Sequence, residues 1–533
     1  MVVFDRLKRA ARRNPSDAFL VLVGLAACVY VVAYPFTVTR YAPMTDLPFH
    51  AANTGILRHY WDTDYHLREQ FEITPIGVPY MSTYVLGALF MLVVPSWIAA
   101  KMAAAIMLAT LPLGLGLMFH GMKKSPLLGL AGLPLVWNFL THWGFLNYVG
   151  ALGLFCAAVG LTLRVLDKPS PTRQIQLSAV LVLLFFTHIF RFPFALLAVV
   201  GTTAVMYPAT RRVWPVLPPL IVPGVLFLMW LRARPALLRS QMQLEKFDLA
   251  RLRELPNYLK EGGFNDPQEA AGLLEAFKIL GGVAFVLCFV ALLDSRWERQ
   301  TKRDWYWFGG VTLVVLGCAG AFFLLFMKLP MSAGLWWYIY PRESVATALL
   351  ALGFLPDLPR ISVVRIAAVL MLAYAPLRLT SAVVENYREF NRVTEDFHQI
   401  TQKIPVGPKL MYLVFDHGGT KKKNTPFIHL PAYVQAEKGG WLSFHFSTFG
   451  GSPLTYHEPK KPGAVIPPAV PLRWEWTPQR FRVLENGRFF DWFLVRNPTS
   501  PAHLFRPDPT IVPIDHVGSW WLYRRESSAA RSN

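Results

Sequence analysis

The chain has 533 residues, of which 53% are hydrophobic and 16% charged, and its formal net charge is +20. Soluble domains average about 25% charged residues, so this composition excludes an ordinary soluble protein and indicates that much of the chain lies in lipid. In a soluble protein the positive charge would suggest nucleic acid. Here much of it falls in short connections between apolar segments, where it orients a membrane protein, and no nucleic-acid partner is expected.

The N-terminus carries a basic cluster followed by the first apolar segment. Residues 1–17 hold Arg6, Lys8, Arg9, Arg12 and Arg13, which predicts a cytoplasmic N-terminus. The apolar segment 18–36 is too long for the core of a signal peptide and lacks a small-residue cleavage pattern, so we expect a retained anchor.

The loop after this segment, 37–79, concentrates ionisable side chains where the chain leaves the bilayer. It begins with Asp46 and His50, and it continues through Arg58-His59-Tyr60 to Asp62, Asp64 and His66. Ionisable groups at a membrane surface are a default hypothesis for a functional site. If the chain turns helical after Asp46, with Pro48 in the first turn, Asp46 and His50 share one face of the helix.

Further apolar stretches of spanning length are separated by connections of alternating charge. They lie near 126–142, 148–164, 175–190, 193–208, 213–232, 276–293, 307–327, 343–356 and 361–379. Every second connection is basic, whereas those at 141–147, 188–193 and 328–342 carry three Lys or Arg in total. With one net crossing in 80–121, the alternation predicts about 11 crossings of the cytoplasmic (inner) membrane and a C-terminal region on its outer side.

Other candidate residues fall at predicted outer ends of the spanning segments. His188 and Arg191 suit a phosphate, although an interfacial histidine and a snorkelling arginine explain them equally well. Arg342 and Glu343 follow an aromatic run and would suit a lipid-linked phosphate, although Glu343 also simply favours a helix N-terminus. The polar insert 233–275 predicts one or two amphipathic helices on the outer surface.

The composition changes near Val384, which predicts two domains: a transmembrane helical domain over 1–383 and a small extracytoplasmic α/β domain over 384–533. Strands are expected at 409–415, 490–495 and 520–523, a helix at 426–438 and a surface loop at 459–471. Four histidines of this domain lack metal-ligand spacing and are expected at its surface: His417, His429, His445 and His457.

The overall layout resembles the GT-C glycosyltransferase superfamily. The likeness lies in a cytoplasmic N-terminus, an outer loop with Asp46 just beyond the first helix, a helical bundle and an outer C-terminal domain. Short motifs add to it: Asp46 to His50, Gly144 to Tyr148, and Thr187-His188. The resemblance implies an α-helical polytopic membrane protein of GT-C-like layout that takes a sugar from a polyprenyl-phosphate donor.

The resemblance also implies roles for these residues. Asp46 would act as a base toward the acceptor or as a ligand of a divalent metal, with His50 as a second catalytic residue. His188, Arg191, Arg342 and Glu343 would bind the lipid-linked substrate. Many members of the superfamily have an acidic pair in this loop, whereas Asp46 stands alone, and 141–147 supplies no carboxylate. A purely structural alternative is that Asp46 caps the helix that follows it.

Three functions remain open from the sequence. The first is a lipid-carrier-dependent glycosyltransferase acting at the outer face of the membrane. The second is a non-catalytic membrane component of cell-envelope assembly. The third is a transporter, for which internal repeats or charges buried within the spanning segments would be expected, and we see neither.

Overall fold

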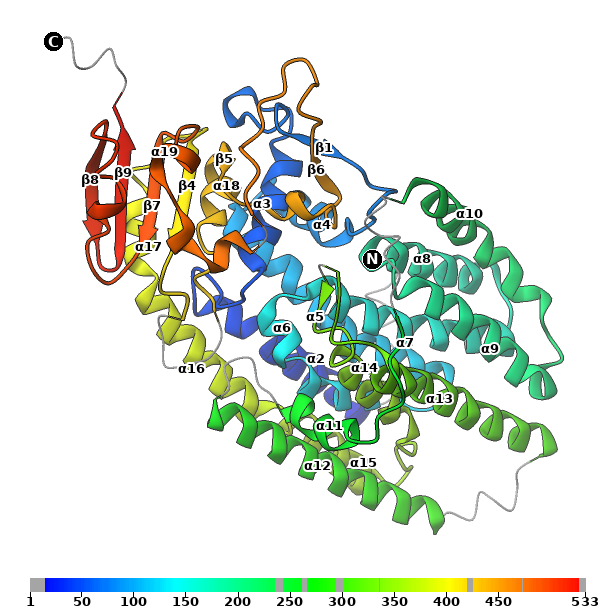
Figure 1. Ribbon diagram of the computed structural model, residues 1–533. Coiled ribbons are helices and arrows are strands. Elements are labelled where there is room, and N and C mark those ends of the chain that lie inside the picture. The colour runs from blue at the N-terminus through cyan, green and yellow to red at the C-terminus, as the bar shows by residue number, and fades with distance from the viewer. Residues whose placement is uncertain are drawn as a thin grey trace.

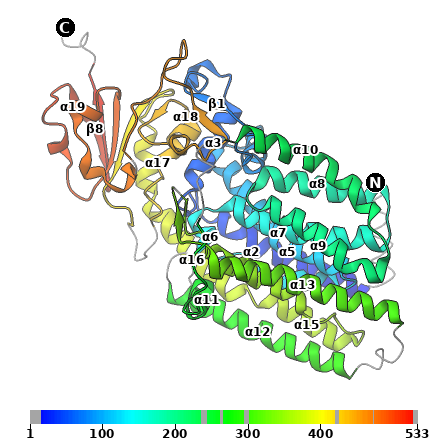
Figure 2. The same ribbon diagram turned by 45° about the vertical axis from the view of Figure 1, so that its right-hand side comes forward.

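The computed structural model describes residues 15–234, 243–260, 266–293, 301–334, 336–418, 425–471 and 473–526. A large bundle of helices forms one part of the molecule, and a five-stranded sheet with short helices forms the other, as Figure 1 shows. The first loop and helix α3 lie between the two parts (Figures 1 and 2).

Eight helices among the described residues are long and apolar enough to cross a membrane, so the protein is a multi-pass membrane protein. They are α2 (Pro15–Thr37), α5 (Ser96–Gly121), α7 (Leu146–Asp167), α9 (Phe192–Thr210), α10 (Leu217–Ala233) with the turn before it, α12 (Pro267–Leu292), α13 (Lys302–Lys328), and α15 (Ser362–Tyr374) joined with α16 (Leu377–Val393). The apolar stretch before α5 forms only the nine-residue helix α4 (Ser82–Phe90), which is too short to span.

Three predicted crossings correspond to shorter elements. They are the 3₁₀ helix η2 (Pro126–Leu135), α8 (Pro171–Thr187), and α14 (Arg342–Ala351) with the turn η6 (Leu352–Phe354). A 3₁₀ helix rises about 2 Å per residue, so η2 covers more distance than an α-helix of the same length. The figure of 11 crossings therefore stays a prediction.

The basic connections gather at one end of the bundle. Arg365 Nη2 lies 2.9 Å from Asp17 Oδ1, and Lys123 Nζ lies 3.0 Å from Asp167 Oδ1. Lys124 Nζ donates to the carbonyl of Leu355 at 2.6 Å. Asp46 and its neighbours lie at the opposite end, beside the sheet domain. This separation agrees with the predicted alternation of basic and non-basic connections between the spanning segments.

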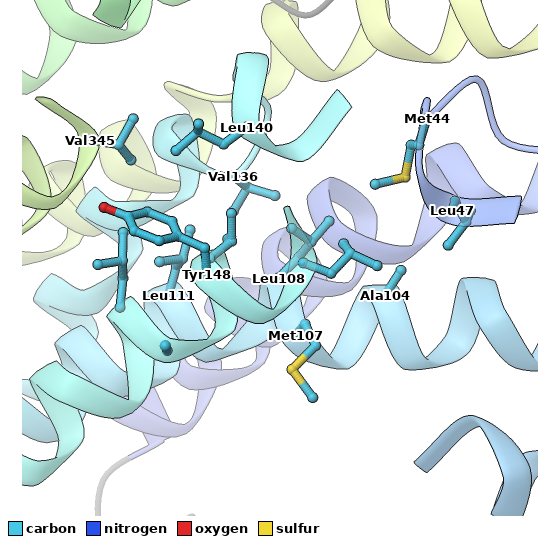
Figure 3. Packing of buried hydrophobic residues seen from close by; sticks show 14 of the residues in the cluster. Met44, Leu47, Ala104, Met107, Leu108, Leu111, Val136, Leu140, Tyr148 and Val345 are labelled. Atoms are coloured by element: carbon cyan, nitrogen blue, oxygen red, sulfur yellow. The ribbon is translucent and has the colours of Figure 1, made fainter. Parts of the chain in front are cut away.

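Small residues allow the helices to pack closely at the centre of the bundle. An ideal Cβ on Gly114 would lie only 1.9 Å from the carbonyl oxygen of Gly153, and one on Gly121 would lie 2.2 Å from that of Gly160. Helices α5 and α7 therefore approach backbone to backbone, as small residues permit in membranes. Figure 3 shows the apolar packing around the start of α7, where Tyr148 is surrounded by aliphatic side chains.

The prediction for the insert 233–275 is partly wrong. Only Arg251–Lys260 forms a separate amphipathic helix, α11, in the part of the insert that the structure describes; residues 235–242 and 261–265 lie outside it. Glu269 and Glu275 belong to the first turns of the spanning helix α12. Glu269 is buried, where Asn386 Nδ2 donates to it at 2.6 Å and His142 lies 3.8 Å away.

The C-terminal domain, called the outer domain below after its predicted side of the membrane, follows α16 and α17 (Glu395–Thr401) and is built on a five-stranded sheet of order β5-β4-β7-β9-β8. The strands are β4 (Lys409–Val414), β5 (Trp441–Leu442), β7 (Trp492–Arg496), β8 (Ile511–Val517) and β9 (Trp520–Arg525). The interior strand β4 runs parallel to both neighbours and is buried, as a continuous apolar run predicts. The expected helix 426–438 forms only over its second half, as α18 (Ala432–Lys438).

The first outer loop packs as part of the outer domain. Strand β1 (Phe71–Ile73) pairs antiparallel with β6 (Leu454–Tyr456), and helix α3 (Leu47–Arg58) packs on α18. A Cβ on Gly55 would lie 2.7 Å from the carbonyl oxygen of Ala436, so the two helices approach closely. The predicted boundary between 383 and 384 falls inside α16, which connects the bundle to the sheet without a break.

Candidate functional site

Asp46 occupies the residue before α3 but does not cap it. Its backbone is in the right-handed helical region, with φ −98° and ψ −6°, and its side chain makes no capping hydrogen bond. The carboxylate instead has its Oδ1 atom 3.1 Å from Nδ1 of His429. The side chain of Asp46 therefore does not act as a helix cap. The expected place of Pro48 in the first turn of the helix is confirmed.

The backbone of Asp46 is held by the loop between η2 and α7. Its N–H donates to the carbonyl of Trp143 at 2.9 Å, and that of Thr45 donates to the carbonyl of His142 at 3.0 Å. Gly144 has φ +103°, and an ideal Cβ there would lie 2.8 Å from Cβ of Asp46. Only glycine fits this position, both for its backbone conformation and for its distance from Asp46.

His50 lies one helical turn after Asp46 and uses both ring nitrogens within the protein. Nε2 lies 2.8 Å from the carbonyl oxygen of Gly144, and Nδ1 lies 3.2 Å from the hydroxyl of Tyr84. A carbonyl only accepts, so Nε2 carries the hydrogen and Nδ1 accepts from the tyrosine. Burial lowers the pKa of His50, which favours this neutral form.

The outer domain supplies two ionisable side chains near Asp46. His429 is 4% exposed, and Glu475 is largely buried and interacts electrostatically with both His429 and Asp46. Burial raises the pKa of Glu475, with the nearby His429 acting in the opposite direction. Glu475 is thus a second carboxylate near Asp46, whereas the loop 141–147 supplies none.

The prediction that the four histidines lie at the surface is wrong for three of them. His429, His445 and His457 are all buried, and His417 is partly buried. His429 is enclosed by the rings of Phe49, Phe444 and Phe446. The absence of metal-ligand spacing does not predict exposure. These histidines are buried because they pack at the junction with the first outer loop.

A row of indole rings borders the same region. The rings of Trp143 and Trp476 are stacked with centroids 6.4 Å apart, and Trp143 lies 5.0 Å from Trp337. Trp143 also accepts the backbone hydrogen bond from Asp46. Partly exposed aromatic faces therefore lie on the loop that holds Asp46 in place.

Arg191 and Glu343 form a buried ion pair at the same end of the bundle. Arg191 Nη2 donates to Glu343 Oε1, and the two residues are 6% and 0% exposed. The Tyr148 hydroxyl donates to the carbonyl of Arg342 at 2.9 Å. The Arg342 guanidinium donates to the backbone carbonyls of Tyr338 and Trp337, and it lies over the ring of Phe145 at 3.9 Å.

Three buried polar atoms next to this ion pair have no hydrogen-bond partner among the described residues. They are Nδ1 of His188, Nε of Arg191 and the hydroxyl of Tyr80. The ring of His188 lies 5.2 Å from that of Tyr80 and 5.5 Å from that of Tyr148.

One segment, 143–148, contacts every predicted site residue or its direct partner. Trp143 and Gly144 hold Asp46 and His50. Phe145 packs under Arg342, while Tyr148 contacts His188 and lies 4.6 Å from the Arg191 guanidinium and 3.5 Å from Glu343. The six side chains therefore surround a single segment, whose Gly-Phe-Leu-Asn-Tyr motif was visible in the sequence.

The described residues contain no group of three His, Cys, Asp or Glu side chains that could hold a metal ion. Around Asp46, His429 contacts the carboxylate and Glu475 interacts with it electrostatically. This set does not match the ligand count of a closed protein metal site.

No family model matches the sequence, and no curated protein matches it. Among solved structures, the crystal structure of ArnT from Cupriavidus metallidurans in the apo state superposes with a TM-score of 0.54 at 12% sequence identity. That match covers 94% of this chain and 97% of that chain. The chain therefore has an ArnT-like fold. ArnT bound to undecaprenyl phosphate is also similar, with a TM-score of 0.47, 14% identity, and coverage of 95% and 98%.

Sequence reasoning missed several residues of this region. His429 and Glu475 lie far from Asp46 in the chain and carry no local signal. Tyr84 carries no such signal either, whereas Tyr148 is the last residue of the Gly144 to Tyr148 motif that was visible in the sequence. Asp62 pairs with His59 at 3.3 Å rather than with Asp46.

Proposed function

We propose that this protein transfers a sugar from a polyprenyl-phosphate carrier to an acceptor at the outer face of the cytoplasmic membrane. The observation that carries the proposal is the position of Asp46. Its carboxylate is oriented by a hydrogen bond rather than used as a helix cap, and the segment 143–148 that holds its backbone also contacts the buried cluster of His188, Arg191, Arg342 and Glu343.

Asp46 acts as the general base in this reaction. An acceptor hydroxyl or amine attacks the anomeric carbon, the bond from that carbon to the phosphate oxygen breaks, and the phosphate leaves with the electron pair. Asp46 takes the proton of the acceptor. Its side chain is 13% exposed, so one carboxylate oxygen remains reachable while the other contacts His429.

The cluster of His188, Arg191, Arg342 and Glu343 binds the phosphate side of the donor. Arg191 Nε and His188 Nδ1 are buried polar atoms without partners, and a phosphate oxygen would satisfy the N–H of Arg191. Glu343 holds the guanidinium of Arg191 in place through their ion pair. Positive charge at this position stabilises the phosphate as it leaves.

His50 orients the site in this proposal. Both of its ring nitrogens are hydrogen-bonded, so it joins α3 to the loop at Gly144 and to Tyr84. The reaction is written here without a divalent metal. Assays after dialysis against a chelator test that point: a loss of transfer restored by a divalent cation would assign Asp46 a ligand role.

Transfer assays with an Asp46→Asn variant test the proposed function. Membranes holding the protein are given lipid-extracted polyprenyl-phosphate sugars carrying a radiolabel, and the label leaving the lipid fraction is measured. Asp46→Asn should reduce transfer at least about 100-fold, the contribution of a general base, with little change in melting temperature. Asp62→Asn, at a half-exposed carboxylate, is the matched control and should retain activity.

Each outcome separates the candidate functions. Full activity of the Asn variant would remove the base role of Asp46. Absence of transfer by the wild-type protein, relative to membranes without it, would instead favour the non-catalytic component of envelope assembly.

A further inference from the structure

His429 belongs to the outer domain, and its side chain contacts the carboxylate of Asp46. It lies in the turn before α18, and its Nδ1 is 3.1 Å from Asp46 Oδ1 and 3.1 Å from the carbonyl oxygen of Thr45. A backbone carbonyl accepts hydrogen bonds and never donates them, so Nδ1 must carry a hydrogen. Thr45 thereby selects the tautomer that also donates to Asp46.

The ring of His429 has little freedom to turn away. Its centroid lies 4.8 Å from that of Phe49 and 5.3 Å from that of Phe446, both in edge-to-face geometry. The turn is continued by α18, which packs on α3 with close backbone approach at Gly55. The donor is therefore fixed relative to the helix that begins beside Asp46.

The second nitrogen of the imidazole is not used for structure. Nε2 of His429 is buried and has no hydrogen-bond partner in the part of the chain that the structure describes. The ionisable groups that act on this region are Asp46, Glu475 and His417. Because Nδ1 donates in either charge state of the ring, its bond to Asp46 does not depend on the proton at Nε2.

We propose that His429 is a positioning residue for Asp46, contributed to the site by the outer domain. Its Nδ1–H holds Oδ1 and keeps the other carboxylate oxygen available for the acceptor proton. The inference rests on the proposed function for its catalytic consequence, but the hydrogen bond itself is testable without turnover.

Two substitutions at position 429 separate positioning from packing. His429→Asn places an N–H close to where Nδ1 stands but removes the aromatic ring. His429→Phe keeps the ring and removes the donor. Positioning predicts that the Asn variant retains kcat within a few-fold, while the Phe variant loses about 10- to 100-fold with an unchanged KM for the lipid donor. If the Phe variant is as active as the Asn variant or more active, the ring matters only for packing and the proposal is overturned.

A chemical probe gives a second readout that does not need transfer activity. A hydrophobic carbodiimide reacts with protonated carboxyl groups, and modification of Asp46 is followed by mass spectrometry in the purified full-length protein. Removing the donor in His429→Phe should free Oδ1 of Asp46 and speed its modification several-fold, whereas His429→Asn should react like the wild type. Equal rates in all three proteins would overturn the proposal. If these rates differ as expected but the wild type transfers no sugar, the proposed function fails and the positioning contact stands.

Discussion

Nδ1 of His429 lies 3.1 Å from Oδ1 of Asp46, although 383 positions separate the two residues in the chain. The contact joins the loop after the first spanning helix to the turn before α18. Because β1 also pairs with β6 and α3 packs on α18, the outer domain packs against the loop and helix on either side of Asp46. The candidate active site is thus assembled from both domains.

Replacing Gly144 should disturb Asp46 directly. Gly144→Ala introduces a Cβ that would lie 2.8 Å from Cβ of Asp46 at a backbone with φ +103°. We expect a destabilisation of about 1–3 kcal/mol, measured as a lower melting temperature in detergent, together with loss of transfer. Gly201→Ala is the matched control, because nothing lies within 4 Å of its Cβ position. An unchanged melting temperature for the Gly144 variant would contradict the close approach.

The ion pair of Arg191 and Glu343 should contribute more than an exposed pair. Glu343→Gln leaves a buried guanidinium without its counter-charge, which should cost about 3–5 kcal/mol of stability. The double variant Arg191→Gln with Glu343→Gln should lose less than the sum of the single changes. Glu275→Gln, in an exposed pair with Arg378 at 2.6 Å, should cost at most about 1 kcal/mol. Strictly additive losses at the buried pair would refute the coupling.

Acidification should destabilise the outer domain through His445. This side chain is 0% exposed, and burial lowers its pKa to about 3. An unfolded histidine titrates near pH 6.5, so between about pH 6.5 and 3 the unfolded state binds the extra proton and stability falls as pH falls, by up to about 1.4 kcal/mol per pH unit.

The comparison is made by melting the protein at pH 7.5 and at pH 5.5. His445→Asn should reduce the loss on acidification, because Asn can still accept the hydrogen bond from the Ser447 N–H. The exposed His503→Asn should leave the loss unchanged. Identical pH dependence in all three proteins would exclude His445 as a source.

Cysteine labelling should establish the sidedness of the membrane. In intact cells, Glu458→Cys in the outer domain should react with a membrane-impermeant maleimide, whereas Lys168→Cys between α7 and α8 should be protected until the membrane is opened. Both positions are exposed in the structure. The reverse pattern would invert the topology predicted from the basic loops.

Local pattern in the sequence was sufficient for the class of protein and for several elements. Long apolar runs such as α5 and α13 must be helical in lipid, since every backbone group has to be paired within the segment. The buried strand β4 and the importance of the Asp46 loop also followed from neighbouring residues alone. These features depend on composition and periodicity over short distances.

The tertiary structure decided what lies next to Asp46 and which polar groups are buried. His429 and Glu475 reach that region only because the outer domain packs on α3, and Glu269 is buried only because α12 meets Asn386. Histidine and glutamate are read as surface residues from sequence because their burial costs free energy unless a partner is present. Those partners come from distant parts of the chain, so only the folded protein brings them together.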